Sequence, residues 1–453
     1  MTRSERGSFG SKIGIILATA GSAVGLGNVW RFPFMTGHNG GAAFILIYIG
    51  CILLLGIPGM ISEFIVGRHS ASNAVRSYGN LSGNRGWRAI GYMGIVTSTI
   101  ILGFYAVVAG WCLQYLMASL FGSLSGDTDY VQNYFVTFSS NPMMPVLWGL
   151  VFILVTHWVI VHGVRGGIER ASKALMPTLF ILLVILVVAS CMLPGAGRGV
   201  EFLLKPDFSK VDSQVFLEAL GQAFFSLSLG TACLCTYASY FGRRTNLVRS
   251  ACQIALIDTV IAILAGLMIF PAAFSVGISP DSGPSLIFIT LPNVFREAFS
   301  SLPAVGYAVS VLFYVLLSLA ALTSTISMHE IGTAFFHEEM HLPRCSAAWI
   351  VTACTGIICV LSSLSVGAVP ALQLAGRSLM DFFDALTAQM LMPVGAFLTC
   401  IYVGWFAPHK AVRDEFTNCG TLRGRLFHVY LFAVKYVCPV FIVLIFLHQF
   451  GMI

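Results

Sequence analysis

Residues 21–33, GSAVGLGNVWRFP, lie within an apolar run and yet contain three glycines, an asparagine and an arginine. Each glycine costs a helix about 1 kcal/mol relative to alanine, and Asn28 and Arg31 interrupt the apolar pattern. In lipid, a broken helix is tolerated only where its freed amides and carbonyls meet protein, water or a ligand. The stretch therefore predicts a membrane helix opened at mid-depth. The alternative is a glycine-rich packing face with a buried polar contact.

A second interruption, SLSLGT at residues 226–231, follows Gly221 and Gln222 in a later apolar run. Glycine-interrupted segments at matching places in two halves of a chain are typical of transporters built from inverted repeats, with the binding site between the breaks. The next apolar run contains a carboxylate, Asp258, and acidic residues within a membrane are functional by default.

The composition places these motifs in an integral membrane protein. Hydrophobic residues make up 57% and charged residues 10%, the mean hydropathy is +0.86, and a soluble domain would carry about 25% charge. The net charge of +6 is scattered, so we expect no nucleic-acid partner. The twelve cysteines fall mostly in apolar runs without metal-type spacing, as small buried hydrophobes do. Neither a metal cluster nor a catalytic constellation is evident, which argues against an enzyme.

Taking about 20 apolar residues per crossing, we expect an all-α protein with eleven membrane spans. They lie at 12–37, 42–66, 89–121, 145–162, 172–193, 214–240, 248–275, 305–336, 345–365, 378–405 and 427–450. The breaks then fall in spans one and six, so residues 1–453 form one membrane domain. Its repeats cover about 12–193 and 214–405, and an additional helix covers about 427–450.

Most Lys and Arg residues fall in the connections on one side of these spans. Because basic residues stay inside, we expect a cytoplasmic N-terminus and an external C-terminus. The short termini and the absence of an outward-facing glycosylation sequon favour a bacterial inner (plasma) membrane. The outer connection at 276–304 is either a lid that dips into the bundle or an ordinary surface loop. Arg68 and His69 are expected to be inner-surface charges, and Lys435 to snorkel or face a neighbouring helix.

GSAVGLGNVWRFP, together with GQAFFSLSLG, TYASY, AGLMIFPAAF and AALTSTIS, closely resembles the neurotransmitter:sodium symporter family, in its bacterial amino-acid transporter branch. The resemblance covers nearly the whole chain. It implies a LeuT-like fold: a 5+5 inverted repeat with broken first and sixth helices, plus one extra helix. It also implies sodium-coupled symport of neutral, hydrophobic or aromatic L-amino acids across the lipid bilayer by alternating access.

The resemblance further implies two Na⁺ sites, and hard cations prefer oxygen ligands. The first would use the substrate carboxylate with Ala23, Asn28, Ser226 and Asp258. The second would use carbonyls of Gly21, Val24 and Ala320 with hydroxyls of Thr323 and Ser324, although such hydroxyls are more often bonded to the preceding helical turn. Since Asp258 supplies a fixed negative charge near Tyr48, Gln222 and Ser226, we expect no chloride requirement.

By the same resemblance, the substrate carboxylate would meet the amides of Leu26 and Gly27 and the Tyr105 hydroxyl, at the positive end of a half-helix. The amine would meet carbonyls near Ala23 and Phe225, with Ser228 close by. Monoamine carriers of this family have an Asp where this chain has Gly25, and the glycine leaves room for a substrate carboxylate. The side-chain pocket would comprise Ser22, Ile101, Val108, Phe225, Thr231, Ser324 and Met328.

The resemblance also implies gates. Arg31 should pair with Asp384 on the outer side, above a lid of Tyr105 and Phe225. Inside, the implied latch has Arg6 paired with Glu338, beside Phe9 and Tyr240; the family usually has Trp and Asp in place of Phe9 and Glu338.

Two further elements follow from the same likeness. Glu63 should brace the broken sixth helix by accepting its free N–H groups. Gly167 and Pro177 match a Gly-x9-Pro pattern at which some relatives unwind, and both residue types weaken a helix.

The alternative function is a substrate-gated ion channel or an amino-acid receptor on the same scaffold. Such a protein would lack a coupled pair of gates, one at each end. Nothing in the sequence specifies an oligomeric state.

Overall fold

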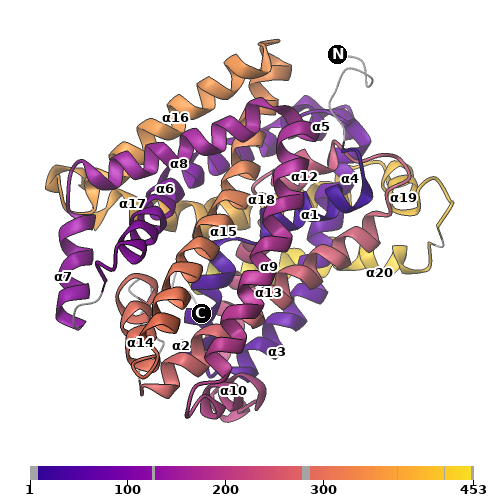
Figure 1. Ribbon diagram of the computed structural model, residues 1–453. Coiled ribbons are helices and arrows are strands. Elements are labelled where there is room, and N and C mark those ends of the chain that lie inside the picture. The colour runs from indigo at the N-terminus through magenta and orange to yellow at the C-terminus, as the bar shows by residue number, and fades with distance from the viewer. Residues whose placement is uncertain (1–8, 125–127, 278–285, 375, 423, 450–453) are drawn as a thin grey trace.

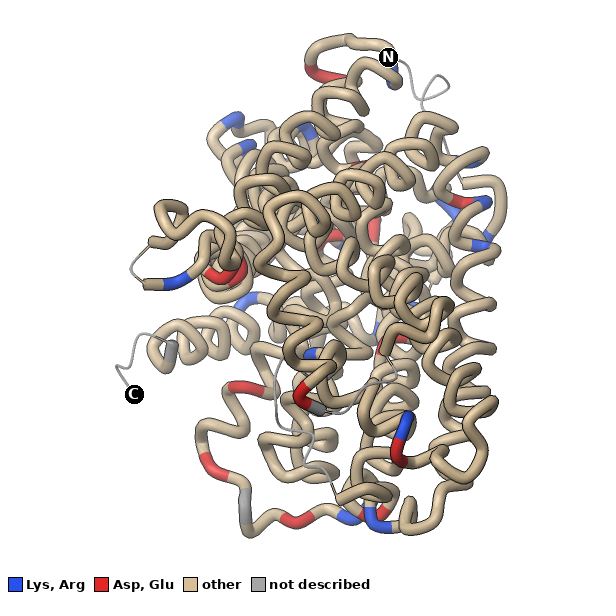
Figure 2. Tube along the Cα trace, turned by 60° about the vertical axis from the view of Figure 1, so that its left-hand side comes forward, with Lys and Arg blue, Asp and Glu red and all other residues tan. Residues whose placement is uncertain are grey.

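The computed structural model describes residues 9–124, 128–277, 286–374, 376–422 and 424–449, and it is almost entirely helical. Within these ranges, nine helices are long and apolar enough to cross a membrane, or ten if one bent pair counts as a span. The remaining expected span, 214–240, consists of two helices that each fall short of this length. The count of eleven and the inverted repeat therefore stay predictions. Figure 2 shows how few charged residues interrupt the trace.

The first half of the chain contains the bent pair and four unbent spans. In chain order the elements are α1 (Lys12–Ala23), the π-helical η1 (Gly27–Arg31), α2 (Phe32–His38), α3 (Ala42–Cys51), η2 (Ile52–Gly56), α4 (Ile57–Ser70), α5 (Ala74–Ser82), η3 (Arg85–Trp87), α6 (Arg88–Leu120), α7 (Thr128–Ser139), α8 (Met144–Val161), η4 (Val164–Glu169), α9 (Arg170–Cys191), α10 (Gly197–Leu204) and η5 (Phe208–Lys210).

The second half follows with α11 (Ser213–Ser226), α12 (Cys233–Ala238), α13 (Leu247–Ser275), η6 (Leu286–Thr290), α14 (Leu291–Ala298), α15 (Pro303–Glu339), α16 (Arg344–Ser365), η7 (Pro370–Leu372), β1 (Gln373–Leu374), β2 (Arg377–Ser378), α17 (Leu379–Asp384), η8 (Ala385–Leu391), α18 (Met392–Ile401), η9 (Tyr402–Phe406), α19 (His409–Thr417), η10 (Gly424–Leu426), α20 (Phe427–Phe432), η11 (Ala433–Val437) and α21 (Cys438–Gln449). The strands β1 and β2 form one antiparallel pair.

The first span opens within the glycine-rich stretch. Helix α1 begins after Ser11, whose hydroxyl caps the amide of Gly14 at 3.0 Å, and it ends at Ala23. The chain resumes as η1 and α2, bent by 54° from α1. Pro33 lies in the first turn of α2, where its missing N–H is not needed. The predicted interruption is thus present.

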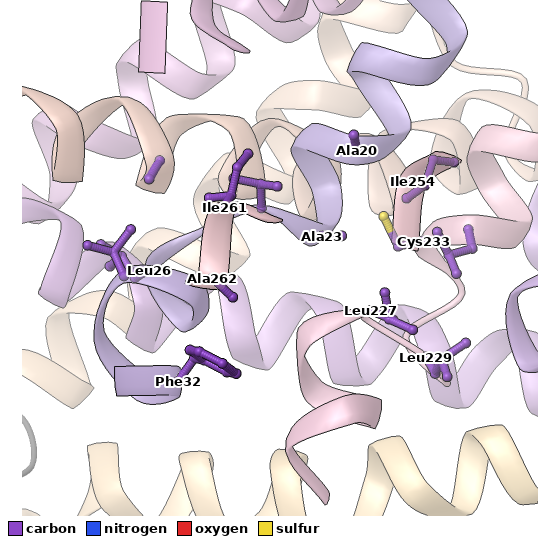
Figure 3. Close-up of a cluster of buried hydrophobic side chains, with 14 of the residues drawn as sticks. Ala20, Ala23, Leu26, Phe32, Leu227, Leu229, Cys233, Ile254, Ile261 and Ala262 are labelled. Carbon is purple, nitrogen blue, oxygen red and sulfur yellow. The ribbon is translucent and has the colours of Figure 1, made fainter. Parts of the chain in front are cut away.

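The second interruption lies between α11 and α12. Helix α11 ends at Ser226, and positive φ angles follow at Ser228 (53°), Gly230 (79°) and Ala232 (62°). Such angles are rare for residues with a Cβ, so this segment is held open by its surroundings. Figure 3 shows that the two breaks share a buried cluster with α13, whose members include Ala23, Leu26, Leu227, Leu229 and Ile261.

The two ends of the bundle differ. Helices α5, α12 and α19 lie toward one end, and α7, α10 and α14 toward the opposite end (Figure 1). The described part of the 276–304 connection packs into the bundle: Ile287, Phe288 and Leu291 are fully buried. The ring of Phe288 lies 5.0 Å from that of Tyr115. This burial matches a segment that dips into the bundle, although residues 278–285 lie outside the described ranges.

One charge expected at the inner surface is buried. Arg68 is 2% exposed, because α19 lies against the end of α4 and covers it. Its guanidinium bonds Glu415 Oε2 at 2.6 Å and Asn418 Oδ1 at 2.9 Å. His69, 35% exposed at its side chain, lies 3.4 Å from the same carboxylate. The expectation for Arg68 was wrong, because the sequence does not show that a later helix folds over this turn.

Candidate functional site

The two breaks meet at one place in the bundle. The Ser228 hydroxyl donates to the carbonyl of Ser22 at 3.1 Å, which joins the sixth span to the first. The Leu26 amide donates to the Tyr105 hydroxyl at 3.0 Å, which joins the first break to α6. The Leu26 amide and the Tyr105 hydroxyl, expected to bind a carboxylate, are therefore adjacent.

A buried carboxylate lies beside this junction. Asp258 is fully buried on α13 and accepts hydrogen bonds from Asn28 Nδ2 at 2.7 Å, Ser226 Oγ at 2.8 Å and Tyr48 OH at 3.2 Å. The side-chain oxygen of Asn28 accepts from the Gly25 amide at 3.0 Å. Three side chains expected at the first Na⁺ site thus lie together with Tyr48. Gln222, one turn before Ser226, is buried with neither side-chain polar atom hydrogen-bonded in the described structure.

A second group of oxygens lies where α1 ends against α15. The Thr323 hydroxyl lies 3.1 Å from the Val24 carbonyl oxygen and 2.9 Å from that of Ala320. The Ser324 hydroxyl lies 3.4 Å from the Val24 oxygen. Gly21 is adjacent, since a Cβ built on it would lie 3.4 Å from Thr323 Cβ. Carbonyl and hydroxyl oxygens in this number suit a hard cation, so the residues fit the expected second Na⁺ site.

Neighbouring side chains approach the first break closely at Gly25 and Gly27. A Cβ on Gly25 would lie 2.3 Å from Ser324 Oγ and 3.0 Å from Tyr105 OH, and a Cβ on Gly27 would lie 2.9 Å from the Phe225 ring. Both distances to the nearest atom are shorter than real Cβ contacts. A Cβ at either position would thus displace a side chain that approaches the first break, Ser324 at Gly25 or Phe225 at Gly27.

A cavity of about 290 Å³ opens beside the first break. Its lining includes seven of the predicted residues: Leu26, Gly27, Arg31, Tyr105, Val108, Phe225 and Asp384. Sequence reasoning missed seven others: Trp30, Phe34, Met35, Phe104, Trp111, Met380 and Asp381. Helical spacing could have found some of them, because Phe34 follows Arg31 by three residues and Asp381 precedes Asp384 by three.

The remaining predicted pocket residues lie around this cavity without lining it. Ile101 and Met328 pack with Phe225 in a small apolar cluster. The Ser22 hydroxyl donates to the Thr19 carbonyl at 2.6 Å, and the Thr231 hydroxyl donates to the Ser228 carbonyl at 2.7 Å.

The outer charges share the cavity without touching. Arg31 lies with its guanidinium carbon 4.2 Å from the centroid of the Phe225 ring. Although Asp384 lines the same cavity, no Arg31 nitrogen in the described structure lies within 4.0 Å of its carboxylate. The expected Arg31–Asp384 pair stays a prediction for a more closed arrangement.

Glu63 contacts the second break as the brace prediction requires. Its Oε1 accepts the Gly230 amide at 2.7 Å. A Cβ on Gly230 would lie 2.1 Å from the Met392 carbonyl oxygen, and one on Gly395 would lie 2.5 Å from the Gly230 oxygen. Backbone-to-backbone contact with α18 therefore holds this segment as well, and sequence reasoning missed Gly395.

At the inner end, Phe9 packs its ring 6.1 Å from that of Tyr240. Glu338 accepts the Asn73 amide at 2.7 Å, while Arg6 lies outside the described residues. Tyr240 donates to Glu330 at 2.6 Å.

Glu330, which sequence reasoning missed, is fully buried and forms an ion pair with Arg344. The inner end therefore contains a buried ion pair between α15 and α16. The sequence of either helix alone does not predict this pair.

Gly167 and Pro177 both lie in wound helix, within η4 and α9. A Cβ on Gly167 would lie 2.0 Å from the Val159 carbonyl oxygen, so this glycine permits close packing on α8. The unwinding expected here stays a prediction for another conformation. Lys435, expected to snorkel or to face a neighbouring helix, lies against η9, with its ammonium 5.2 Å from the centroid of the Trp405 ring.

A helical membrane bundle with two opened spans, whose amides and oxygens converge between them, defines a secondary transporter. A family model described as the sodium:neurotransmitter symporter family matches residues 6–134 and 129–452. The chain is 36% identical to the sodium-dependent transporter YhdH of Bacillus subtilis strain 168, over the full length of both. It is 33% identical to a sodium-dependent transporter of Haemophilus influenzae, with 98% of each chain covered.

The structure of MhsT in complex with L-phenylalanine has the same fold, with a TM-score of 0.88 and 38% identity, covering 98% of this chain and 99% of that one. The chain therefore belongs to the sodium:neurotransmitter symporter family, as its motifs predicted, and is a sodium-dependent membrane transporter.

Proposed function

We propose that this chain takes up neutral L-amino acids with hydrophobic or aromatic side chains, coupled to inward Na⁺ movement and without a chloride requirement. The observation that carries the proposal is the Leu26 amide beside the Tyr105 hydroxyl, at the first break, where Gly25 lets Ser324 and Tyr105 approach the main chain closely. The relative MhsT was solved with L-phenylalanine, which supports an amino acid as the substrate.

The site has groups for the carboxylate and for the side chain of such a substrate. The α-carboxylate binds at the opened end of the first span, where free amides attract anions, and completes the first Na⁺ site beside Asn28. The side chain packs against the apolar residues Val108 and Phe225, beside Ile101 and Met328. A charged substrate side chain would be desolvated there at a high cost.

Coupling follows from two Na⁺ sites that hold the breaks together. Because each site uses oxygens from the first span and from α13 or α15, Na⁺ stabilises the arrangement that binds substrate. Na⁺ must bind the outward-open state better than the inward-open state, since equal affinity would shift no equilibrium. Each Na⁺ that moves inward gains about 2.3 kcal/mol per 100 mV of membrane potential. In this proposal the N-terminus lies in the cytoplasm of a bacterial cell.

Asp258 makes chloride unnecessary in this proposal. Its carboxylate already receives three side-chain hydrogen bonds from Asn28, Ser226 and Tyr48, so a negative charge is fixed beside the first Na⁺ site. Replacing chloride with gluconate should leave uptake unchanged. Asp258→Ser should make uptake chloride-dependent, and a sharp loss in the wild type on gluconate would overturn this part of the proposal.

The deciding experiment is uptake of the twenty amino acids into sealed vesicles containing the purified protein. Accumulation above equilibrium that requires an inward Na⁺ gradient and vanishes in K⁺ supports symport. A substrate-gated channel, the alternative on this scaffold, would instead give Na⁺ flux without substrate accumulation. A preference for charged amino acids would refute the proposed pocket chemistry.

A further inference from the structure

A hollow of about 890 Å³ lies outside the transport site, between the end of α4, the start of α13 and helix α19. Its lining includes Arg68, Arg243, Arg244 and Lys410. Three membrane spans have an end here: Ala42–Ser70, Leu247–Ser275 and Leu379–Phe406. The hollow therefore lies at one membrane interface, where the phosphates of phospholipids are found. Trp405 is half exposed and lies three residues before Pro408, which lines the hollow. Tryptophan is common at membrane interfaces.

The charges around the hollow are unbalanced. Arg243, Arg244 and Lys410 are exposed, and none of them has a carboxylate within 4.0 Å in the described structure. The carboxylate of Glu415 is already neutralised by Arg68 at 2.6 Å. Asp414 is the remaining acidic group among the described lining residues. Among the described lining residues, three cations without an ion pair thus outnumber one such carboxylate.

The floor of the hollow is rigid. Arg68 bonds the Glu415 carboxylate and main chain, the Thr245 carbonyl and Asn418. Burial would raise the pKa of Glu415, but hydrogen bonds from His69 and Arg68 outweigh it, so the pKa of this carboxyl lies below its usual range. This ionised network joins the end of α4 to the C-terminal part of α19, at Glu415 and Asn418.

The N-terminus of α19 offers unused donors. No side chain caps this helix of nine residues, and its first backbone bond runs from Val412 N to the Pro408 oxygen. The amides of His409, Lys410 and Ala411 therefore lack a partner in the described structure, and Lys410 and Ala411 line the hollow. By contrast, α13 is capped by Asn246, whose side chain accepts the Arg249 amide at 2.9 Å. Free amides at a helix start bind phosphate.

We propose that this hollow binds a phosphate group, supplied by the headgroup of an anionic phospholipid or by free phosphate. Arg243, Arg244 and Lys410 supply the charge, and the first amides of α19 supply directed hydrogen bonds. Basic pockets between spans recognise phospholipid headgroups in this way. The inference depends on membrane insertion and not on the proposed substrate.

The test measures binding to the purified full-length protein in detergent at fixed ionic strength. The probes are dioctanoyl phosphatidylglycerol, dioctanoyl phosphatidylcholine, dioctanoylglycerol and inorganic phosphate. Phosphatidylglycerol should bind more tightly than phosphatidylcholine, and dioctanoylglycerol should bind weakest. If inorganic phosphate displaces phosphatidylglycerol at a concentration similar to that of the lipid, the ligand is free phosphate. If it does not displace the lipid, the ligand is the phospholipid headgroup.

Variants locate the site. Arg243→Gln with Arg244→Gln should weaken binding of the preferred phosphate probe about fivefold per cation removed. The matched control, Arg85→Gln with Arg170→Gln, removes two exposed arginines elsewhere and should leave binding unchanged. Pro408→Ser provides a cap for α19 and should weaken binding several-fold without lowering thermal stability.

Two results would overturn the inference. One is equal loss of binding in the Arg243/Arg244 and Arg85/Arg170 double variants, which would indicate general surface attraction. The other is equal binding of phosphatidylglycerol and dioctanoylglycerol, which would indicate that only the acyl chains are recognised.

Discussion

The sharpest test of the transport site is Gly25→Ala. The added Cβ would lie 2.3 Å from Ser324 Oγ and 3.0 Å from Tyr105 OH, whereas ordinary contact begins at 3.4 Å. Ser324 or the first break must then move by about 1 Å, and overpacking of this size typically costs about 1–3 kcal/mol. Because Ser324 and Tyr105 are the proposed Na⁺ and carboxylate groups, this cost should appear in substrate binding. Affinity should fall between about 5-fold and 150-fold.

The assay is equilibrium binding of the preferred amino acid to purified protein at saturating Na⁺. Gly221→Ala is the matched control, because Gly221 also belongs to a broken span but a Cβ there would meet nothing within 4 Å. It should bind substrate like the wild type. Thermal unfolding of both variants separates loss of the site from loss of the fold.

A double-mutant cycle with Ser324→Ala identifies the contact. That change removes Oγ and leaves Ser324 Cβ at 3.4 Å from the new methyl group. The two changes should therefore cost less together than the sum of their separate costs, by about fivefold or more in affinity. Additive costs, or a Gly25→Ala variant within twofold of the wild type, would refute the reasoning.

Three further outcomes follow from buried charges. Glu63→Gln should lower thermal stability by about 1 kcal/mol, because a neutral acceptor replaces the carboxylate at the Gly230 amide, and Glu63→Ala should lower it further; equal stability of all three proteins would contradict this. Arg344→Met should cost about 3–5 kcal/mol by leaving Glu330 buried and unpaired, and adding Glu330→Gln should recover part of the loss in thermal unfolding. Because the pKa of Glu415 is depressed by folding, its stabilisation is present above the ordinary Glu pKa of about 4.3 and is lost as the pH falls through the folded value. Wild type and Glu415→Gln should therefore differ in thermal stability at pH 7 and converge as the pH falls below the depressed pKa of folded Glu415.

The opened spans could be predicted because glycine and polar residues are conspicuous in an apolar run. The predicted stretches at 21–33 and 226–231 contain the observed breaks, and the family motifs correctly identified the fold. Asn28, Ser226 and Asp258 lie on three different spans, so their convergence came from the resemblance and not from any spacing within one helix.

The missed residues share a physical reason. Lipid is as apolar as the protein interior, so a membrane helix shows no contrast between the face that packs and the face that does not. The sequence therefore does not distinguish Trp30, Phe34 and Trp111, which line the cavity, from lipid-facing residues. Arg68 and Glu330 lie near span ends, where charges are usually solvated, and only the fold brings their partners to them.

The second break is kept open by its contacts and not by its own preference. Positive φ angles at Ser228 and Ala232 each cost on the order of 1–3 kcal/mol, so an isolated segment would rewind. The carboxylate of Glu63 bonds the Gly230 amide, and Gly395 lets α18 approach the Gly230 main chain closely. Because both supports act on one residue, the segment is a fixed part of the site. Conformational change is then expected to move the helices on either side of it as bodies, without winding residues 227–232 into helix.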